Sequence, residues 1–204
     1  MGRFFNLENP IWRFIGNLAD FFLLSVCWYL CCIPVVTAGC GTTALYYVTM
    51  KMAANKEGYT FRSFLASFRA NFRPATLIWL LFLGIGFMLY ADFSWCLTGG
   101  SLFARSMLIT FGIVAVLYLL CLRLVFPLIA RCDNTLKALL KMCFAMSIRS
   151  FLPLLSTVVV TAAFFSLGIF VFWPLLLVAP GLGAYINSFV FNRVLEKYGL
   201  GLPG

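Results

Sequence analysis

The longest uncharged stretch of the sequence, residues 150–192, is the feature that most constrains the fold. It contains 43 residues without a single Lys, Arg, Asp or Glu. A helix needs about 20 consecutive apolar residues to cross a lipid bilayer, so this stretch is long enough for two crossings. We therefore expect a chain built around helices that span a membrane.

The overall composition supports an integral membrane protein. Hydrophobic residues make up 63% of the chain, charged residues make up 10%, and the mean hydropathy is +1.02. About a quarter of the residues of an ordinary soluble domain are charged, so this chain has too few polar groups to cover a water-exposed surface. The expected fold is all-α, with residues 1–204 forming a single transmembrane domain.

The number of spans depends on a second uncharged stretch, residues 21–50. Its 30 residues are more than one crossing needs and fewer than two crossings need. Helix-breaking Pro34, Gly39 and Gly41 lie in its middle, where a hairpin would turn. We therefore predict six transmembrane helices, with five as the alternative if this stretch crosses only once. The six predicted spans are at about 14–34, 38–54, 74–91, 106–130, 150–170 and 173–192.

The basic residues predict the orientation of the chain. Most of the Lys and Arg residues lie in the segments 51–73, 131–149 and 193–197. Cytoplasmic loops carry an excess of Lys and Arg, and six spans place all three segments on the cytoplasmic side. Both termini are then cytoplasmic. Because most of the net charge of +9 lies in these short segments, it indicates contact with anionic lipid, and we expect no binding of nucleic acid.

Two of the basic segments are predicted to form amphipathic inner helices, at about 58–73 and 134–149. In each one apolar side chains recur at helical spacing on one face, and basic side chains lie beside or opposite them. Such helices lie on a membrane surface or dock against a partner, and both alternatives remain open. The candidate contact residues are Phe61, Arg62, Phe64, Phe68, Arg69, Arg73, Lys137 and Lys141.

The sequence contains little that could carry catalysis. It has no histidine, so neither a Ser/His/Asp nor a Cys/His set can form. The eight cysteines lie mostly inside apolar runs, where a free thiol behaves as a small buried hydrophobe. Gly84 and Gly86 are expected to allow close helix packing rather than to bind phosphate. We expect no enzyme activity, no cofactor and no metal site.

Polar residues inside or near the predicted spans are the other candidates for function, because such groups are costly in lipid. Asp20 lies near the inner end of its span, and Arg123 is close enough to Arg131 to extend toward the headgroups. For both, anchoring at the interface or mutual pairing is favoured over a transport role. The candidate intramembrane polar residues are Asp20, Thr42, Thr43, Arg123 and Asn187.

Several motifs resemble the YesL-like family of small bacterial membrane proteins. They include Phe4-Phe-Asn-Leu-Glu-Asn-Pro-Ile-Trp-Arg-Phe14, Pro34-Val-Val-Thr-Ala-Gly39, Thr42-Thr-Ala-Leu-Tyr-Tyr-Val48 and Gly58-Tyr-Thr-Phe-Arg-Ser-Phe64. The resemblance implies a bacterial plasma-membrane protein. It also implies a gene that lies beside those of carbohydrate ABC importers and sugar-responsive sensor kinases. It supplies no established activity and no functional residues.

Three functions are therefore expected as alternatives, and in each of them the protein contacts the lipid bilayer. The first is an accessory membrane protein of carbohydrate uptake, whose inner helices dock subunits of an ABC importer. The second is a stand-alone small-solute transporter or channel that uses the broken helices around 34–41 and 180–183. The third is a membrane adaptor of a sugar-responsive sensor kinase.

Overall fold

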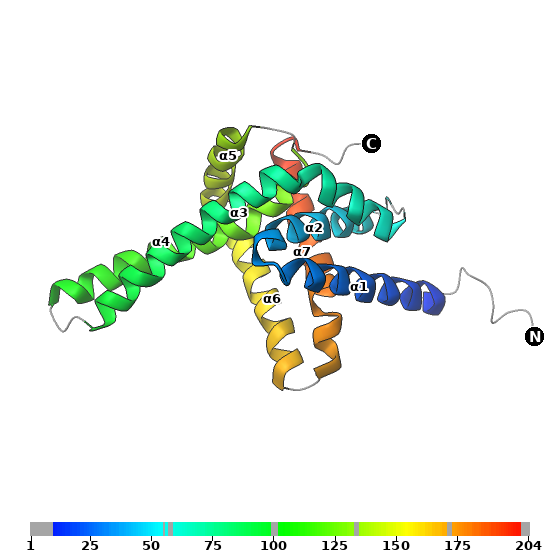
Figure 1. Ribbon diagram of the computed structural model, residues 1–204, viewed down its shortest axis with the longest axis horizontal. Coiled ribbons are helices and arrows are strands. Elements are labelled where there is room, and N and C mark those ends of the chain that lie inside the picture. Colours follow the sequence, from blue (N-terminus) through cyan, green and yellow to red (C-terminus); the bar gives the residue numbers. More distant parts are fainter. Residues whose placement is uncertain are drawn as a thin grey trace, which may run out of the picture.

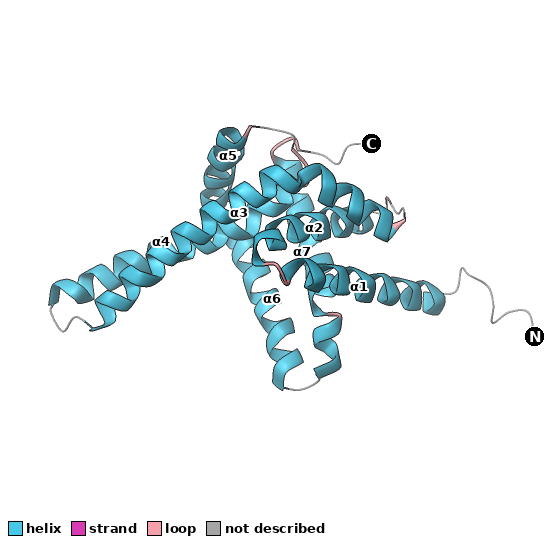
Figure 2. Ribbon diagram, in the orientation of Figure 1, coloured by secondary structure: helices cyan, strands magenta, loops and turns pink. Residues whose placement is uncertain are grey.

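The computed structural model describes residues 10–54, 56, 59–98, 102–132, 135–170 and 173–200, and within these ranges the fold is all-α, as predicted (Figures 1 and 2). The elements in chain order are α1 (Pro10–Cys32), the 3-10 helix η1 (Val35–Thr37), α2 (Ala38–Ala53), α3 (Thr60–Thr98), α4 (Leu102–Ile129), α5 (Leu136–Arg149), α6 (Phe151–Phe170), the 3-10 helix η2 (Trp173–Leu177) and α7 (Ala179–Lys197). The N-terminal part of the Phe4–Phe14 motif and the predicted starts of the inner helices, Gly58 and Asn134, lie outside the described residues.

Helix α2 is at the centre of the structure, and α7 lies beside it (Figure 1). It packs against α1, α3, α4 and α7, and 11 of its 16 residues are buried. Helix α7 also has 11 buried residues out of 19. Both helices carry buried polar side chains, among them Thr43, Thr49, Asn187 and Ser188. The least apolar of the long segments thus occupy the inside of the protein.

Three helices are long and apolar enough to cross a membrane, namely α3, α4 and α6. In the most apolar window of each, between 17% and 22% of the residues are buried inside the protein. Large apolar side chains therefore face outward, as Phe87, Ile109 and Leu152 do with at least 70% of their surface exposed in each case. This is the surface expected of helices that face lipid.

The six predicted spans are not confirmed. The apolar part of α1, Leu18–Cys32, is a shorter helix, and neither α2 nor α7 qualifies as a span by length and composition. Enclosed by other helices, α2 and α7 do not need a lipid-facing surface, so hydropathy alone does not identify them. Figure 1 also shows the α3/α4 hairpin and the α6/α7 pair leaving the core in different directions.

The predicted boundary at Pro74 is wrong. The inner helix at 58–73 and the span from 74 were expected as two elements, but α3 runs through Pro74 without ending. A proline removes one backbone hydrogen bond, and helices in apolar surroundings tolerate it when neighbouring groups compensate. The connection between the third and fourth predicted spans, 74–91 and 106–130, is also shorter than expected, because α3 continues to Thr98 and α4 begins at Leu102.

Close contact between α1 and α7 depends on Gly181. Its backbone N–H donates to Ser25 Oγ at 2.9 Å, and Ser25 Oγ donates to the Phe21 carbonyl oxygen at 2.8 Å. A Cβ atom on Gly181 would lie 2.5 Å from that same carbonyl oxygen. The Pro180–Gly183 segment, predicted to kink a span, instead forms the first turn of α7.

The two glycines of α3 differ in their surroundings. A Cβ on Gly86 would lie 2.6 Å from the Tyr118 hydroxyl oxygen, so the expectation of close helix packing is correct there. A Cβ on Gly84 would meet no atom within 4 Å, so the same expectation is wrong for Gly84.

We expect Gly181→Ala to destabilise the protein by about 2 kcal/mol, because overpacking a tight contact against backbone costs on the order of 1–3 kcal/mol. Gly84→Ala is the matched control: the new methyl group meets open space, and alanine favours the helix. The measurement is the thermal unfolding midpoint of both variants in one detergent. Equal midpoints for the two variants would contradict this account of the α1/α7 contact.

Candidate functional site

Arg123 on α4 reaches across to α6 and is the centre of a polar cluster. Its Nη2 donates to the Thr157 carbonyl oxygen at 3.0 Å and to Thr161 Oγ1. Thr161 Oγ1 in turn donates to the Thr157 carbonyl oxygen at 2.9 Å and accepts a hydrogen bond from Asn187 Nδ2 at 2.9 Å. We call Arg123, Thr157, Thr161 and Asn187 the Arg123 cluster. It ties together α4, α6 and α7.

A pocket of about 210 Å³ adjoins this cluster, and we call it the Arg123 pocket. Residues of α1, α2, α4, α6 and α7 line it. Trp28 Nε1 donates to Thr42 Oγ1 at 3.0 Å on the α1/α2 side of the pocket, and Thr42 Oγ1 donates to the Ala38 carbonyl oxygen at 2.8 Å. Its polar lining residues include Trp28, Thr42, Arg123 and Thr161, and no Asp or Glu is among the described residues that line it.

Two polar atoms of the cluster are buried without a hydrogen-bond partner. They are Arg123 Nε, a donor, and Asn187 Oδ1, an acceptor. A buried polar atom without a partner costs free energy, so few are found in folded proteins and each needs an explanation. The cluster therefore keeps unused capacity for hydrogen bonding beside a pocket that carries a guanidinium and no carboxylate.

The structure brings together three of the five predicted intramembrane polar residues. Thr42 and Arg123 line the pocket, and Asn187 joins them through its hydrogen bond to Thr161. Thr43 is fully buried and donates to the Gly39 carbonyl oxygen of its own helix at 3.0 Å. Asp20 lies half-buried on α1 and does not line the pocket.

The Arg123 guanidinium donates to the carbonyl oxygen of Thr157 and to the hydroxyl of Thr161 on α6. Neither partner is an acidic side chain. The expected anchoring of Arg123 at the membrane interface stays a prediction.

Three residues of the site were not among the predicted candidates: Trp28, Thr157 and Thr161. The two threonines are four residues apart in an otherwise apolar helix, which places both on one face of α6. This spacing was visible in the sequence. The contact with Arg123 was not, because it joins positions 34 and 38 residues apart.

The apolar face of the first predicted inner helix, now the start of α3, is partly covered by the protein itself. Phe64 is buried at 2% exposure, and Phe68 packs against the core. The Cys40 thiol donates to the Phe68 carbonyl oxygen at 3.0 Å, which fixes this part of α3 against α2. The remaining predicted contact residues are all exposed: Phe61, Arg62, Arg69, Arg73, Lys137 and Lys141.

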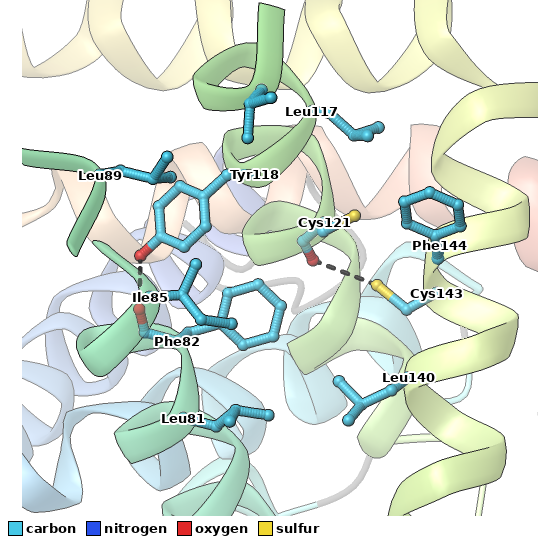
Figure 3. A pocket seen from close by; sticks show the side chains of 11 residues that line it. Leu81, Phe82, Ile85, Leu89, Leu117, Tyr118, Cys121, Leu140, Cys143 and Phe144 are labelled. Atoms are coloured by element: carbon cyan, nitrogen blue, oxygen red, sulfur yellow. Dashed lines mark hydrogen bonds between the residues drawn. The ribbon is translucent and has the colours of Figure 1, made fainter. Parts of the chain in front are cut away.

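A larger pocket, of about 330 Å³, lies among α3, α4 and α5 but has an apolar lining (Figure 3). The Tyr118 hydroxyl at its edge donates to the Phe82 carbonyl oxygen at 2.9 Å, and the Cys143 thiol donates to the Cys121 carbonyl oxygen at 3.3 Å. Both polar groups are thus occupied within the protein. This pocket offers apolar surface only, so the Arg123 pocket is the better candidate for a polar ligand.

The eight cysteines, all among the described residues, form no disulfide, and each is buried or half-buried. The expectation that they act as small hydrophobes in the interior is therefore confirmed. Among the described residues, no group of three or more Cys, His, Asp or Glu residues is placed to hold a metal ion.

An all-α chain with apolar outer helices around buried polar side chains belongs to the class of helical membrane proteins. The resemblance to the YesL-like family is confirmed: residues 21–93 match the model of the family described as "Protein of unknown function, DUF624", which is this group of small membrane proteins. The matched segment covers the second half of α1, all of α2 and most of α3. No curated protein and no solved structure matches the chain.

Proposed function

We propose that this protein is a small-solute transporter or channel that binds an anionic solute at the Arg123 pocket. The observation that carries the proposal is a guanidinium at a pocket among apolar helices, without a carboxylate in the described lining. A charge in such surroundings is costly, and a planar guanidinium matches the geometry of carboxylate and phosphate groups. The volume of about 210 Å³ favours a solute smaller than a typical drug-sized ligand.

A purely structural role for Arg123 is the alternative explanation. Its bonds to Thr157 and Thr161 do connect α4 to α6. The pocket that Arg123 lines favours binding over this alternative, because it gives a ligand room at a side chain whose buried Nε has no partner within the described residues.

We expect Arg123→Gln to lower the rate of anion uptake roughly 10- to 100-fold, because a hydrogen bond to a charged group contributes about 1.5–3 kcal/mol. The measurement is uptake of labelled acetate, lactate and inorganic phosphate into proteoliposomes, with glucose as the neutral solute. Thr161→Val should also slow uptake, since it removes the hydroxyl that Arg123 and Asn187 share.

The matched control for this experiment is Thr76→Val. Thr76 Oγ1 is a buried hydroxyl without a hydrogen-bond partner, so its loss should leave uptake unchanged. Faster uptake of glucose than of all three anions, or equal rates for wild type and Arg123→Gln, would refute the assignment of the site.

The proposed topology has six spans, both termini in the cytoplasm, and the plasma membrane of a bacterium as location. The lengths of α3, α4 and α6 support three of the spans. The basic residues at the ends of α2, α5 and α7, namely Lys51, Arg149 and Lys197, support a common inner face for these ends.

A reporter fused to the N-terminus distinguishes six spans from five. With six spans, a fluorescent protein at this position matures in the cytoplasm and alkaline phosphatase stays inactive, because the N-terminus is inside. With five spans the two readouts are exchanged. The same pair of reporters at the C-terminus is the control, since both topologies place that end in the cytoplasm.

A second candidate function is the accessory role in carbohydrate uptake by an ABC importer, or the related role as adaptor of a sensor kinase. The exposed row Arg62, Arg69 and Arg73 on α3 favours it, together with exposed Phe61 and Phe72. A shallow pocket of about 470 Å³ lies beside Arg69 and Arg73. Basic and aromatic side chains are enriched where proteins bind acidic partners.

Charge reversal by Arg62→Glu, Arg69→Glu and Arg73→Glu together should abolish co-purification of importer subunits or a sensor kinase in mild detergent. The reason is that the variant presents three like charges to an acidic partner surface. Mass spectrometry of the co-purified proteins is the measurement. Arg123→Gln is the control and should leave the complex intact, while the charge-reversed protein should keep its uptake activity.

If the charge-reversed protein lost uptake and Arg123→Gln lost the complex, uptake would be assigned to the α3 surface and partner binding to the Arg123 cluster. If neither set of substitutions changed uptake or co-purification, both assignments would be wrong. Lys137→Glu with Lys141→Glu tests whether the exposed face of α5 belongs to the same docking surface.

A further inference from the structure

Three cationic side chains from two helices meet at one pocket near the ends of α5 and α7. Arg149 is the last residue of α5, and Arg193 and Lys197 lie in the C-terminal part of α7. Together with Ser150 and Ser156 they line a pocket of about 430 Å³, which we call the basic pocket. It is separate from the Arg123 pocket, with which it shares no lining residue.

The charges of the basic pocket are not balanced within the part of the chain that the structure describes. No Asp or Glu lines the pocket. Arg193 and Lys197 are four residues apart on one helix, and like charges at this spacing repel each other. An anion between them and Arg149 would relieve that repulsion, so the arrangement favours occupation by a negatively charged group.

Apolar side chains follow the pocket residues at helical spacing along the same two helices. Val160 of α6, four residues after Ser156, is half-buried, and Ile186 of α7, four residues before Val190, is 36% exposed. Val190 and Val194 lie in the wall of the pocket itself. A free phosphate ion would have no use for this surface, whereas the acyl chains of a phospholipid would cover it.

We propose that the basic pocket binds the phosphate group of an anionic phospholipid, with the acyl chains along the exposed apolar side chains of α6 and α7. Basic pockets between membrane helices recognise lipid headgroups by this combination of charge and adjoining apolar surface. Lipid binding at this pocket requires neither solute binding at Arg123 nor a docking partner at α3, so this proposal can be tested independently of both.

The test is a lipid titration of the purified full-length chain in a nonionic detergent, read by native mass spectrometry. The probes are phosphatidylglycerol, phosphatidylcholine and inorganic phosphate. One basic residue near an anionic lipid contributes about fivefold in affinity. Arg149→Gln with Arg193→Gln should therefore weaken phosphatidylglycerol binding about 25-fold, and Lys197→Gln alone about fivefold.

The matched control is Lys137→Gln with Lys141→Gln, which removes the same number of charges from exposed positions of α5 outside the pocket. This control should bind phosphatidylglycerol like the wild type. All substituted residues are exposed, and equal thermal midpoints would verify that the variants are folded.

Three results would overturn the proposal. Equal loss in the control pair would mean that net charge attracts the lipid without a site. Equal affinity for phosphatidylcholine would mean that the negative charge is not recognised. Displacement of phosphatidylglycerol by inorganic phosphate at an equal concentration would assign the pocket to the free ion.

Discussion

The absence of hydrogen-bonding solvent around the outer helices is the constraint on which this structure depends. A polar group that faces lipid tails has no partner, so each one must be satisfied inside the protein. The chain meets this requirement by enclosing its less apolar helices, α2 and α7, behind the apolar helices α1, α3, α4 and α6. The pair Thr49 and Ser188, hydrogen-bonded at 2.9 Å between these two inner helices, illustrates the result.

Arg123 and Arg131, in and just beyond α4, satisfy their polar groups in different ways. Arg131, just beyond α4, donates to the Leu200 carbonyl oxygen at 2.7 Å and to Asn192 Oδ1, and Asn192 Nδ2 donates to the Met50 carbonyl oxygen at 3.2 Å. This network joins the ends of α2, α4 and α7. Burial lowers the pKa of the Arg131 guanidinium, and the nearby Glu196 carboxylate opposes that shift.

Arg123 lies inside α4, and it lines a pocket together with residues of α1 and α2. The hydrogen bonds of Arg123 reach α6, whereas those of Arg131 reach α7 and the residues that follow it. For this reason Arg123 supports a proposal about a ligand, and Arg131 supports an account of how the helix ends are held together.

Local sequence patterns predicted the helical elements well and their boundaries less well. The uncharged stretches and the amphipathic spacing identified every α-helix from α1 to α7, because both are properties of residues close together in the chain. Pro74 was misjudged as a boundary, since proline ends a helix in water more readily than in a helix packed against others. The status of α2 as a span was not resolved, because hydropathy does not distinguish lipid from protein as surroundings.

For the candidate site, the sequence by itself identified polar residues in apolar helices as candidates for function, and Thr42, Arg123 and Asn187 were among them. It also determined the all-α class, because the apolar composition leaves helices as the way to satisfy the backbone. Only the tertiary structure decided that Arg123 meets Thr161, that Asn187 joins them, and that Phe64 is covered by the core. These contacts join residues on separate helices, and they depend on how side chains pack across helices rather than on any local pattern.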